Sequence, residues 1–127
     1  MKYIDCIDQI TAKQLSGFFV GWKSPLSPER HYDILRGSTH FIVAFDRDIA
    51  VGFVTALSDG VNSSFIPLLE VLPQYQNQDI GSELIRRMLA KLEHITNVDL
   101  TCDPGIQPFY ERFKMMRSSR MVLRKYK

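Results

Sequence analysis

The stretch LLEVLPQYQNQDIGSELIRRML, residues 68–89, leads from an apolar segment through a polar loop into a helix. Apolar residues recur at helical spacing in its second half and predict a helix over about 81–93. The loop before it holds three glutamines, Asp79 and Gly81, although a plain connection needs only a short turn. Backbone N–H groups at a helix start have no partners within the helix, and the helix dipole makes them suited to phosphate. The same loop also fits a simpler interpretation, in which Asp79 caps the helix and nothing binds.

Outward from this stretch, the sequence predicts strands and helices over nearly the whole chain. Ser27, Pro28 and Gly37 mark the ends of one helix. The predicted elements are, in order, strand 2–7, helix 11–22, helix 28–36, two strands around the turn 46–48, strand 63–73, helix 81–93, strand 97–102, helix 106–113 and a hairpin in 114–127. This order, β-α-α-β-β-β-α-β-α-β-β, includes a β-α-β crossover. It predicts an α/β (α+β) fold with a mixed central β-sheet and helices on both faces.

The bulk composition places the chain among ordinary globular proteins. Its 127 residues suffice for one hydrophobic core, so we expect a single domain over 1–127. Hydrophobic residues make up 45% and charged residues 24%, which argues against a disordered or membrane-spanning protein. The net charge of +2 is too small to indicate binding to nucleic acid or to a membrane surface.

The N-terminal residues do not resemble an export signal. Asp5 and Asp8 lie close to the start, and no apolar run accompanies them. We therefore expect a cytoplasmic protein whose two cysteines, Cys6 and Cys102, are free thiols. The three histidines lie on separate segments without metal-ligand spacing, so we expect no metal.

Two motifs resemble those of a known family. The pattern V-L-P-x-Y-Q-x-x-D-I-G-S-x-L, residues 71–84, resembles the acetyl-CoA loop of the GNAT superfamily of N-acetyltransferases, whose signature is Arg/Gln-x-x-Gly-x-Gly/Ala. Gln76 matches the first position of that signature and Gly81 the last. The segment PFYERFKMM, residues 108–116, looks like the family's lYeklGF segment and follows the next strand at the expected distance. Together with the order of elements, the resemblance covers nearly the whole chain and implies a GNAT fold.

The sequence departs from the family pattern at two positions. Asp79 stands where the family has its first loop glycine, and Lys114 stands where it has the glycine of GF. Aspartate tolerates left-handed backbone geometry, so the loop can keep its shape. A carboxylate about 5 Å from a phosphate costs on the order of 1–3 kcal/mol at surface-like dielectric. We expect Asp79 to point to solvent and coenzyme A still to bind; a cap at Asp79 would instead abolish binding.

The resemblance also implies where acetyl-CoA binds. In GNAT proteins the strand before the loop splays from its neighbour, and the pantetheine arm inserts there like an added strand. Backbone groups of Leu69 and Val71 would bind the thioester oxygen and the pantetheine amide, and Pro67, unusual inside a sheet, is tolerable beside such a splay. The diphosphate would lie on the backbone amides that follow Gln76, those of Gln78, Asp79, Ile80, Gly81 and Ser82.

Two side chains are candidates for proton transfer. The resemblance makes Tyr110 the general acid that protonates the departing thiolate; the alternative is that it only packs with the neighbouring phenylalanines. Glu70 is the only charge within SFIPLLEVL and is the candidate general base, since a lone carboxylate among apolar residues often marks a site. Strand alternation places its side chain on the face of Leu68 and Leu72. A structural glutamate bonded to an arginine or tyrosine, or proton transfer through water, stays open.

The resemblance implies direct transfer of an acetyl group from acetyl-CoA to a primary amine, with both bound in a ternary complex. The acceptor is a small molecule or peptide that the sequence does not name. The basic end, residues 117–127, either attracts an anionic acceptor or the coenzyme's 3′-phosphate, or is the solvated face of an edge strand. The alternative function is that of a catalytically inactive GNAT-fold sensor that binds coenzyme A or a partner. We expect no nucleic-acid or membrane partner and leave a homodimer open.

Overall fold

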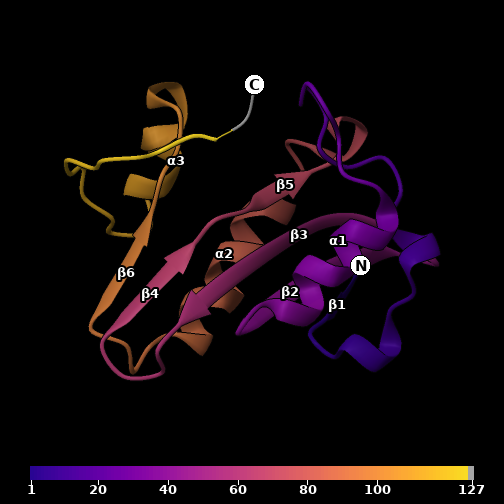
Figure 1. The fold of residues 1–127 in the computed structure, drawn as a ribbon, viewed down its shortest axis with the longest axis horizontal. Helices are drawn as coiled ribbons and strands as arrows, with labels where there is room; N and C mark the ends of the chain where they lie inside the picture. Colours follow the sequence, from indigo (N-terminus) through magenta and orange to yellow (C-terminus); the bar gives the residue numbers. More distant parts are fainter. Residues whose placement is uncertain (126–127) are drawn as a thin grey trace.

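A computed structural model describes residues 1–125 of the chain, and Figure 1 shows its arrangement of strands and helices. The strands are β1 (Lys2–Ile4), β2 (His40–Asp46), β3 (Ile49–Ser58), β4 (Ser63–Ile66), β5 (Leu69–Val71) and β6 (Asn97–Leu100). The helices are α1 (Pro28–Gly37), α2 (Ile80–Lys91) and α3 (Gln107–Glu111), with short 3-10 helices that include η2 (Ala12–Leu15). Within residues 1–125, none of the helices has the length and apolar composition needed to cross a bilayer.

The strands form one mixed sheet. Its order is β1-β2-β3-β4-β6, and β5 pairs with β3 beside β4. Paired strands are antiparallel except β4 and β6, which are parallel because the chain returns between them through the crossover helix α2. Helix α2 packs on one face of the sheet and α1 on the other (Figure 1). The predicted mixed sheet with helices on both faces is confirmed.

Each face of the sheet buries its own apolar cluster. On the α2 face, Leu84, Ile85 and Met88 are fully enclosed, as their helical spacing predicts. On the α1 face, Phe53 of β3 packs with Leu35 of α1 and with aromatic residues of the preceding loop. Strand β3 serves both clusters because successive side chains point to opposite faces. It is therefore a rigid support for the neighbouring strand β5.

The single strand predicted over 63–73 is divided by a bulge into β4 and β5. Val54 pairs with Leu69, and Leu57 pairs with Phe65. Between these two pairs the chain advances three residues along β3 but four residues from β4 to β5, so the extra residue forms a bulge. Pro67 lies within this irregular part, where a missing N–H does not interrupt the ladder. Only β4 is paired with β6, so the sheet opens beside β5. The strand next to the loop motif is thus splayed.

The helix expected over 11–22 is wrong beyond its first residues. Only η2 is helical there, and it is a single 3-10 turn. Gly17, Phe19 and Gly21 have positive φ values of 91°, 64° and 85°, which a right-handed helix does not allow. The apolar spacing that suggested a helix belongs instead to a compact loop that buries Phe18 and Phe19.

The hairpin expected over 114–127 is also wrong in its described part, because residues 114–125 have no regular secondary structure. The segment RSSR, residues 117–120, lacks the glycine or asparagine that a tight hairpin turn favours. Lys114 adopts a left-handed conformation (φ 66°) at the position of the family glycine, and the chain changes direction there. It then runs back towards the open side of the sheet (Figure 1). Residues 126–127 lie outside the described residues.

Candidate active site

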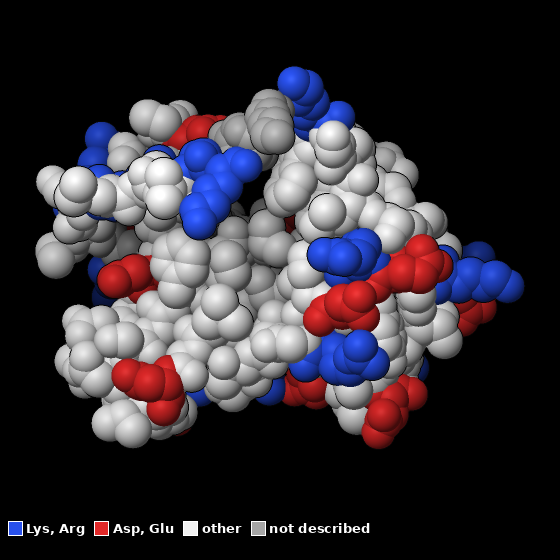
Figure 2. All heavy atoms as spheres, in the orientation of Figure 1, with Lys and Arg blue, Asp and Glu red and all other residues white. Residues whose placement is uncertain are grey.

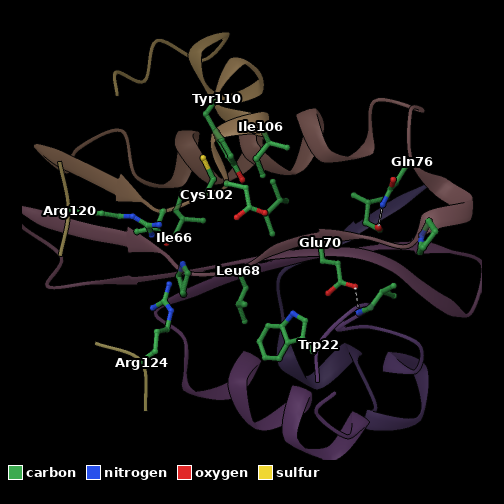
Figure 3. Close-up of a pocket in the computed structure, with 17 residues that line it drawn as sticks. Trp22, Ile66, Leu68, Glu70, Gln76, Cys102, Ile106, Tyr110, Arg120 and Arg124 are labelled. Carbon is green, nitrogen blue, oxygen red and sulfur yellow. Dashed lines mark hydrogen bonds between the residues drawn. The ribbon is translucent and has the colours of Figure 1, made fainter. Parts of the chain in front are cut away.

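A cleft of about 540 Å³ opens where β5 and β6 part. Strand β5 and the bulge form one wall, and the residues after β6 together with α3 form the other. The loop before α1 contributes Val20 and Trp22, and the C-terminal segment contributes Arg120 and Arg124 (Figure 3). The predicted site residues that line this cleft are Leu69, Glu70, Val71, Gln76 and Tyr110.

The backbone of β5 presents hydrogen-bonding groups to the cleft. Leu68 C=O accepts a hydrogen bond from a β3 amide at 3.0 Å, and Leu72 N–H donates to a β3 carbonyl at 2.9 Å. Backbone groups of successive strand residues turn to opposite sides, so those of Leu69 and Val71 turn away from β3. Gln76 Nε2 donates to Val71 C=O at 3.0 Å, which ties the loop to the end of the strand. The remaining groups form an edge that a strand-like ligand can pair with.

The loop before α2 leaves its amides without partners. Asn77 and Asp79 have positive φ values of 63° and 67°. The first helical hydrogen bond runs from Glu83 N–H to Asp79 C=O at 3.0 Å, and among the described residues the N–H groups of 78–82 bond to nothing. These amides stand at the positive end of the α2 dipole. They are the same amides on which the family resemblance implies that a diphosphate lies.

The carboxylate of Asp79 does not cap the helix. It accepts a hydrogen bond from Arg86 Nη2 at 2.8 Å, and Arg86 also contacts Glu83 at 3.0 Å. Sequence reasoning missed Arg86, although a signal was available, since positions 79, 83 and 86 share one helical face. The nearby guanidinium offsets the negative charge that a phosphate would otherwise meet at this loop.

Tyr110 lies on the α3 wall, 9% exposed, with its ring packed edge-on against Phe109 at 5.0 Å. Burial raises the pKa of Tyr110 to about 12, and the charge of a Cys102 thiolate acts in the same direction. Figure 3 shows its hydroxyl between Cys102 and Ile106, directed into the cleft. The hydroxyl has no hydrogen-bond partner among residues 1–125. It is therefore protonated at neutral pH and free to donate to a ligand.

Glu70 anchors the loop that forms the facing wall. Its oxygens accept hydrogen bonds from Phe19 N–H at 2.9 and 3.0 Å and from Val20 N–H at 3.3 Å. The left-handed backbone of Phe19 costs on the order of 1–3 kcal/mol for a bulky residue. The carboxylate stabilises that turn and so positions Trp22, whose ring packs on Phe19 at 4.8 Å. Glu70 thus has a structural role through backbone amides, rather than through an arginine or tyrosine.

Cys102 and Asp103, just after β6, also line the cleft. Cys102 is a half-buried free thiol and Cys6 an exposed one. Within residues 1–125, no three side chains of His, Cys, Asp or Glu are grouped to hold a metal ion. The chemistry that the lining supports is proton transfer by single side chains and binding by backbone amides.

Comparisons with known proteins bear directly on this geometry. A family model described as the acetyltransferase (GNAT) domain matches residues 6–121. The chain belongs to the GNAT acetyltransferase family. No curated protein matches it at a significant level.

Solved structures resemble this GNAT chain over most of its length. A presumed acetyltransferase from Deinococcus radiodurans R1 has 40% identity and a TM-score of 0.94, covering 98% of this chain and 87% of its own. A GNAT family acetyltransferase from Streptococcus pneumoniae TIGR4 has 28% identity and a TM-score of 0.70, covering 85% and 84%. A protein from methicillin-resistant Staphylococcus aureus, with 22% identity, a TM-score of 0.82 and 98% coverage of each chain, shows the fold alone.

We predict that the charge at position 79 tunes coenzyme affinity in this GNAT protein. Asp79→Asn keeps a residue that tolerates the left-handed backbone, so the Kd for coenzyme A should fall about threefold. Arg86→Gln should raise Kd by about the same factor, because it leaves the Asp79 carboxylate unpaired. Titration calorimetry measures both. Arg87→Gln is the matched control, because it loses the contact with Glu83 at 2.7 Å and the stacking on Tyr3 but no contact with Asp79. Three equal Kd values would show that the phosphates do not reach this loop.

We predict that Glu70→Gln destabilises the fold and loosens the loop. A neutral amide replaces a charged acceptor of backbone N–H groups, so the free energy of unfolding should drop by about 2 kcal/mol. Trp22 is the chain's only tryptophan, and its emission should shift to longer wavelength as the loop opens. Urea unfolding followed by fluorescence measures both effects. Glu93→Gln, at an exposed site, is the control, and identical curves for the two variants would contradict the anchoring role.

Proposed function

We propose that this protein moves an acetyl group from acetyl-CoA to a primary amine by direct transfer in a ternary complex. The observation that carries this proposal is a single cleft lined at one end by Gln76 of the coenzyme loop and further along by the protonated hydroxyl of Tyr110. The backbone groups of Leu69 and Val71 that turn away from β3 lie between them. This arrangement suits a long ligand whose charged part and reacting part are far apart.

The residues present fit the coenzyme. Amides of residues 78–82 have no hydrogen-bond partner among residues 1–125 and would hold the diphosphate. Gly81 lies close to the end of β5, since a Cβ there would stand 3.7 Å from Val71. Leu69 and Val71 would hold the pantetheine arm through their backbone groups. Bound acetyl-CoA supplies the acetyl group as an activated thioester.

Transfer needs one proton donor and one proton acceptor. As the amine nitrogen forms its bond to the acetyl carbon, the carbon–sulfur bond breaks and Tyr110 donates its hydroxyl proton to the sulfur. The proton that the amine loses passes to a base. Glu70 lines the cleft and is the candidate base, with water as the alternative, because both carboxylate oxygens already accept amide hydrogen bonds.

Two measurements test the proposed function. Calorimetry with acetyl-CoA should give saturable binding, and a thiol-release assay over a panel of amines should give turnover. Absence of binding at millimolar coenzyme would overturn the proposal. Binding without turnover on any amine would favour the alternative, a GNAT-fold sensor that holds coenzyme A without catalysis.

The same assay separates the two roles of Glu70. A general base contributes about a hundredfold or more to kcat and produces an acidic limb in its pH profile. If Glu70 is the base, Glu70→Gln loses both. If it only anchors the loop, KM rises while the pH profile keeps its shape.

A further inference from the structure

Two guanidinium groups stand at the end of the cleft that faces away from the coenzyme loop. Arg120 and Arg124 both line the cleft, and Figure 3 shows them on the side opposite Gln76, with Glu70 and Tyr110 between. In the space-filling view of Figure 2, basic side chains overhang a hollow in the surface. The segment that carries them has no regular secondary structure, so tertiary contacts determine its position over the cleft.

Neither arginine has an ion-pair or hydrogen-bond partner among the described residues. Arg120 and Arg124 form no ion pair or hydrogen bond within residues 1–125. Arg117, in the same segment, differs, because it bonds both oxygens of Glu111 at 3.1 Å. An unpaired guanidinium in a concave site matches the oxygens of a carboxylate or phosphate in two parallel hydrogen bonds. These two side chains are therefore suited to an anionic group of a ligand.

The anion at this end belongs to the acceptor rather than to the coenzyme. In the proposed function, the coenzyme's phosphates lie at the loop before α2, on the other side of the reacting atoms. A ligand group that reaches Arg120 and Arg124 must approach Tyr110 from the opposite direction. That direction is the one left for the amine.

The lining of the cleft also includes negatively charged carboxylates and an apolar surface. The carboxylates of Glu70 and Asp103 line the cleft, and neither forms an ion pair with the arginines in the part of the chain that the structure describes. Trp22, 46% exposed, and Val20, 56% exposed, supply an apolar wall. A ligand with an ammonium group, a carbon spacer and an anionic group complements all three features.

We propose that the acceptor is an anionic amine, a primary amine joined through an apolar spacer to a carboxylate or phosphate that Arg120 and Arg124 bind. This inference rests on the proposed function and adds to it the chemical class of the acceptor. The amine faces the acetyl group near Tyr110, and the spacer packs on Trp22.

Matched pairs of amines test the proposal. Linear ω-amino acids of increasing length are compared with their own carboxamides, and O-phosphoethanolamine is compared with ethanolamine, so that each pair differs only in the anionic group. The anionic member should have a kcat/KM about tenfold or more above its neutral partner, chiefly through KM. The two series distinguish carboxylate from phosphate. Equal or better turnover of the neutral members would overturn the proposal.

Variants connect that preference to the two arginines. The double variant Arg120→Gln/Arg124→Gln should lose the preference by raising KM for the anionic member about tenfold or more, with no change for the neutral member. Arg117→Gln changes the net charge in the same segment and should leave the preference intact. A double variant that keeps the preference, or an Arg117→Gln variant that loses it equally, would refute the assignment.

A binding measurement keeps this test separate from that of catalysis. Trp22 fluorescence is followed while each anionic amine is added to protein saturated with coenzyme A. Saturable quenching that disappears in the double variant supports the anion site, even where no amine is acetylated and the proposed function therefore fails. No response to any anionic amine overturns the anion site, whatever the turnover with neutral amines.

Discussion

Tyr110→Phe is expected to lower kcat about a hundredfold at neutral pH while leaving the Kd for acetyl-CoA unchanged. The variant removes the proton donor but keeps the ring, and the hydroxyl has no hydrogen-bond partner among residues 1–125 whose loss would disturb the fold. Because the pKa of Tyr110 is raised to about 12, the hydroxyl is a donor across the whole neutral range. A thiol-release assay together with calorimetry separates the chemical step from coenzyme binding.

The control for this variant is Tyr3→Phe. It makes the same change on β1, where Tyr3 stacks with Arg87 at 4.3 Å and does not line the cleft. Its kcat should match that of the wild type, and both variants should unfold at temperatures close to that of the wild type. Full turnover by Tyr110→Phe would assign protonation of the thiolate to another group, and Tyr110 would keep only its packing role.

Acid is expected to destabilise this protein between about pH 6.5 and pH 4 through His31. This residue of α1 is completely buried, with the Phe53 ring at 4.2 Å and the Phe19 ring at 5.0 Å. Burial lowers the pKa of His31 from 6.5 to about 4, and the backbone of Leu15 opposes this too weakly to offset it. Neither ring nitrogen has a well-formed hydrogen bond among the described residues.

The sign of the effect follows from proton uptake. The unfolded chain takes up a proton on His31 as pH falls through 6.5, while the folded chain resists until about pH 4. The free energy of unfolding should therefore decline over this interval by up to about 3 kcal/mol and then level off as far as this residue is concerned. Urea unfolding at a series of pH values measures the decline.

The comparison variant is His31→Leu, which removes the titrating group and keeps an apolar side chain in the core. Burial also lowers the pKa of His40, so only the difference between variant and wild type reports on His31. The difference in free energy of unfolding should stay constant with pH if the imidazole is protonated freely in the folded protein. Such a result would mean that water reaches the ring.

Several elements could be predicted from the sequence because short-range physics determines them. The buried stripe of α2 follows from apolar spacing, and its start follows from the polar loop with Gly81. Pro67, which cannot take part in a regular ladder, is a local sign of the bulge between β4 and β5, although the sequence predicted a single strand over 63–73. The loop over 11–22 could not be predicted in this way, because its apolar residues also fit a helical period while Phe19 is left-handed.

The candidate site depended on contacts that no local pattern encodes. Glu70 bonds to an amide 51 residues away in sequence, and that contact shapes the wall that presents Trp22. Arg120 and Arg124 reach the cleft from a segment expected to form a hairpin. The direction of the Asp79 carboxylate depended on the guanidinium of Arg86, two helical turns further along α2.

The amino-acid sequence by itself determined which face of α2 is buried and that a polar loop leads into this helix, since these follow from side chains within a few residues of one another. The tertiary structure alone decided which partner satisfies each charged group, and hence which groups are left for a ligand. The partner of a charged group is the one nearest in space, and the residues that surround the cleft come from distant parts of the chain. Only the folded structure therefore shows which charges are paired and which face the cleft.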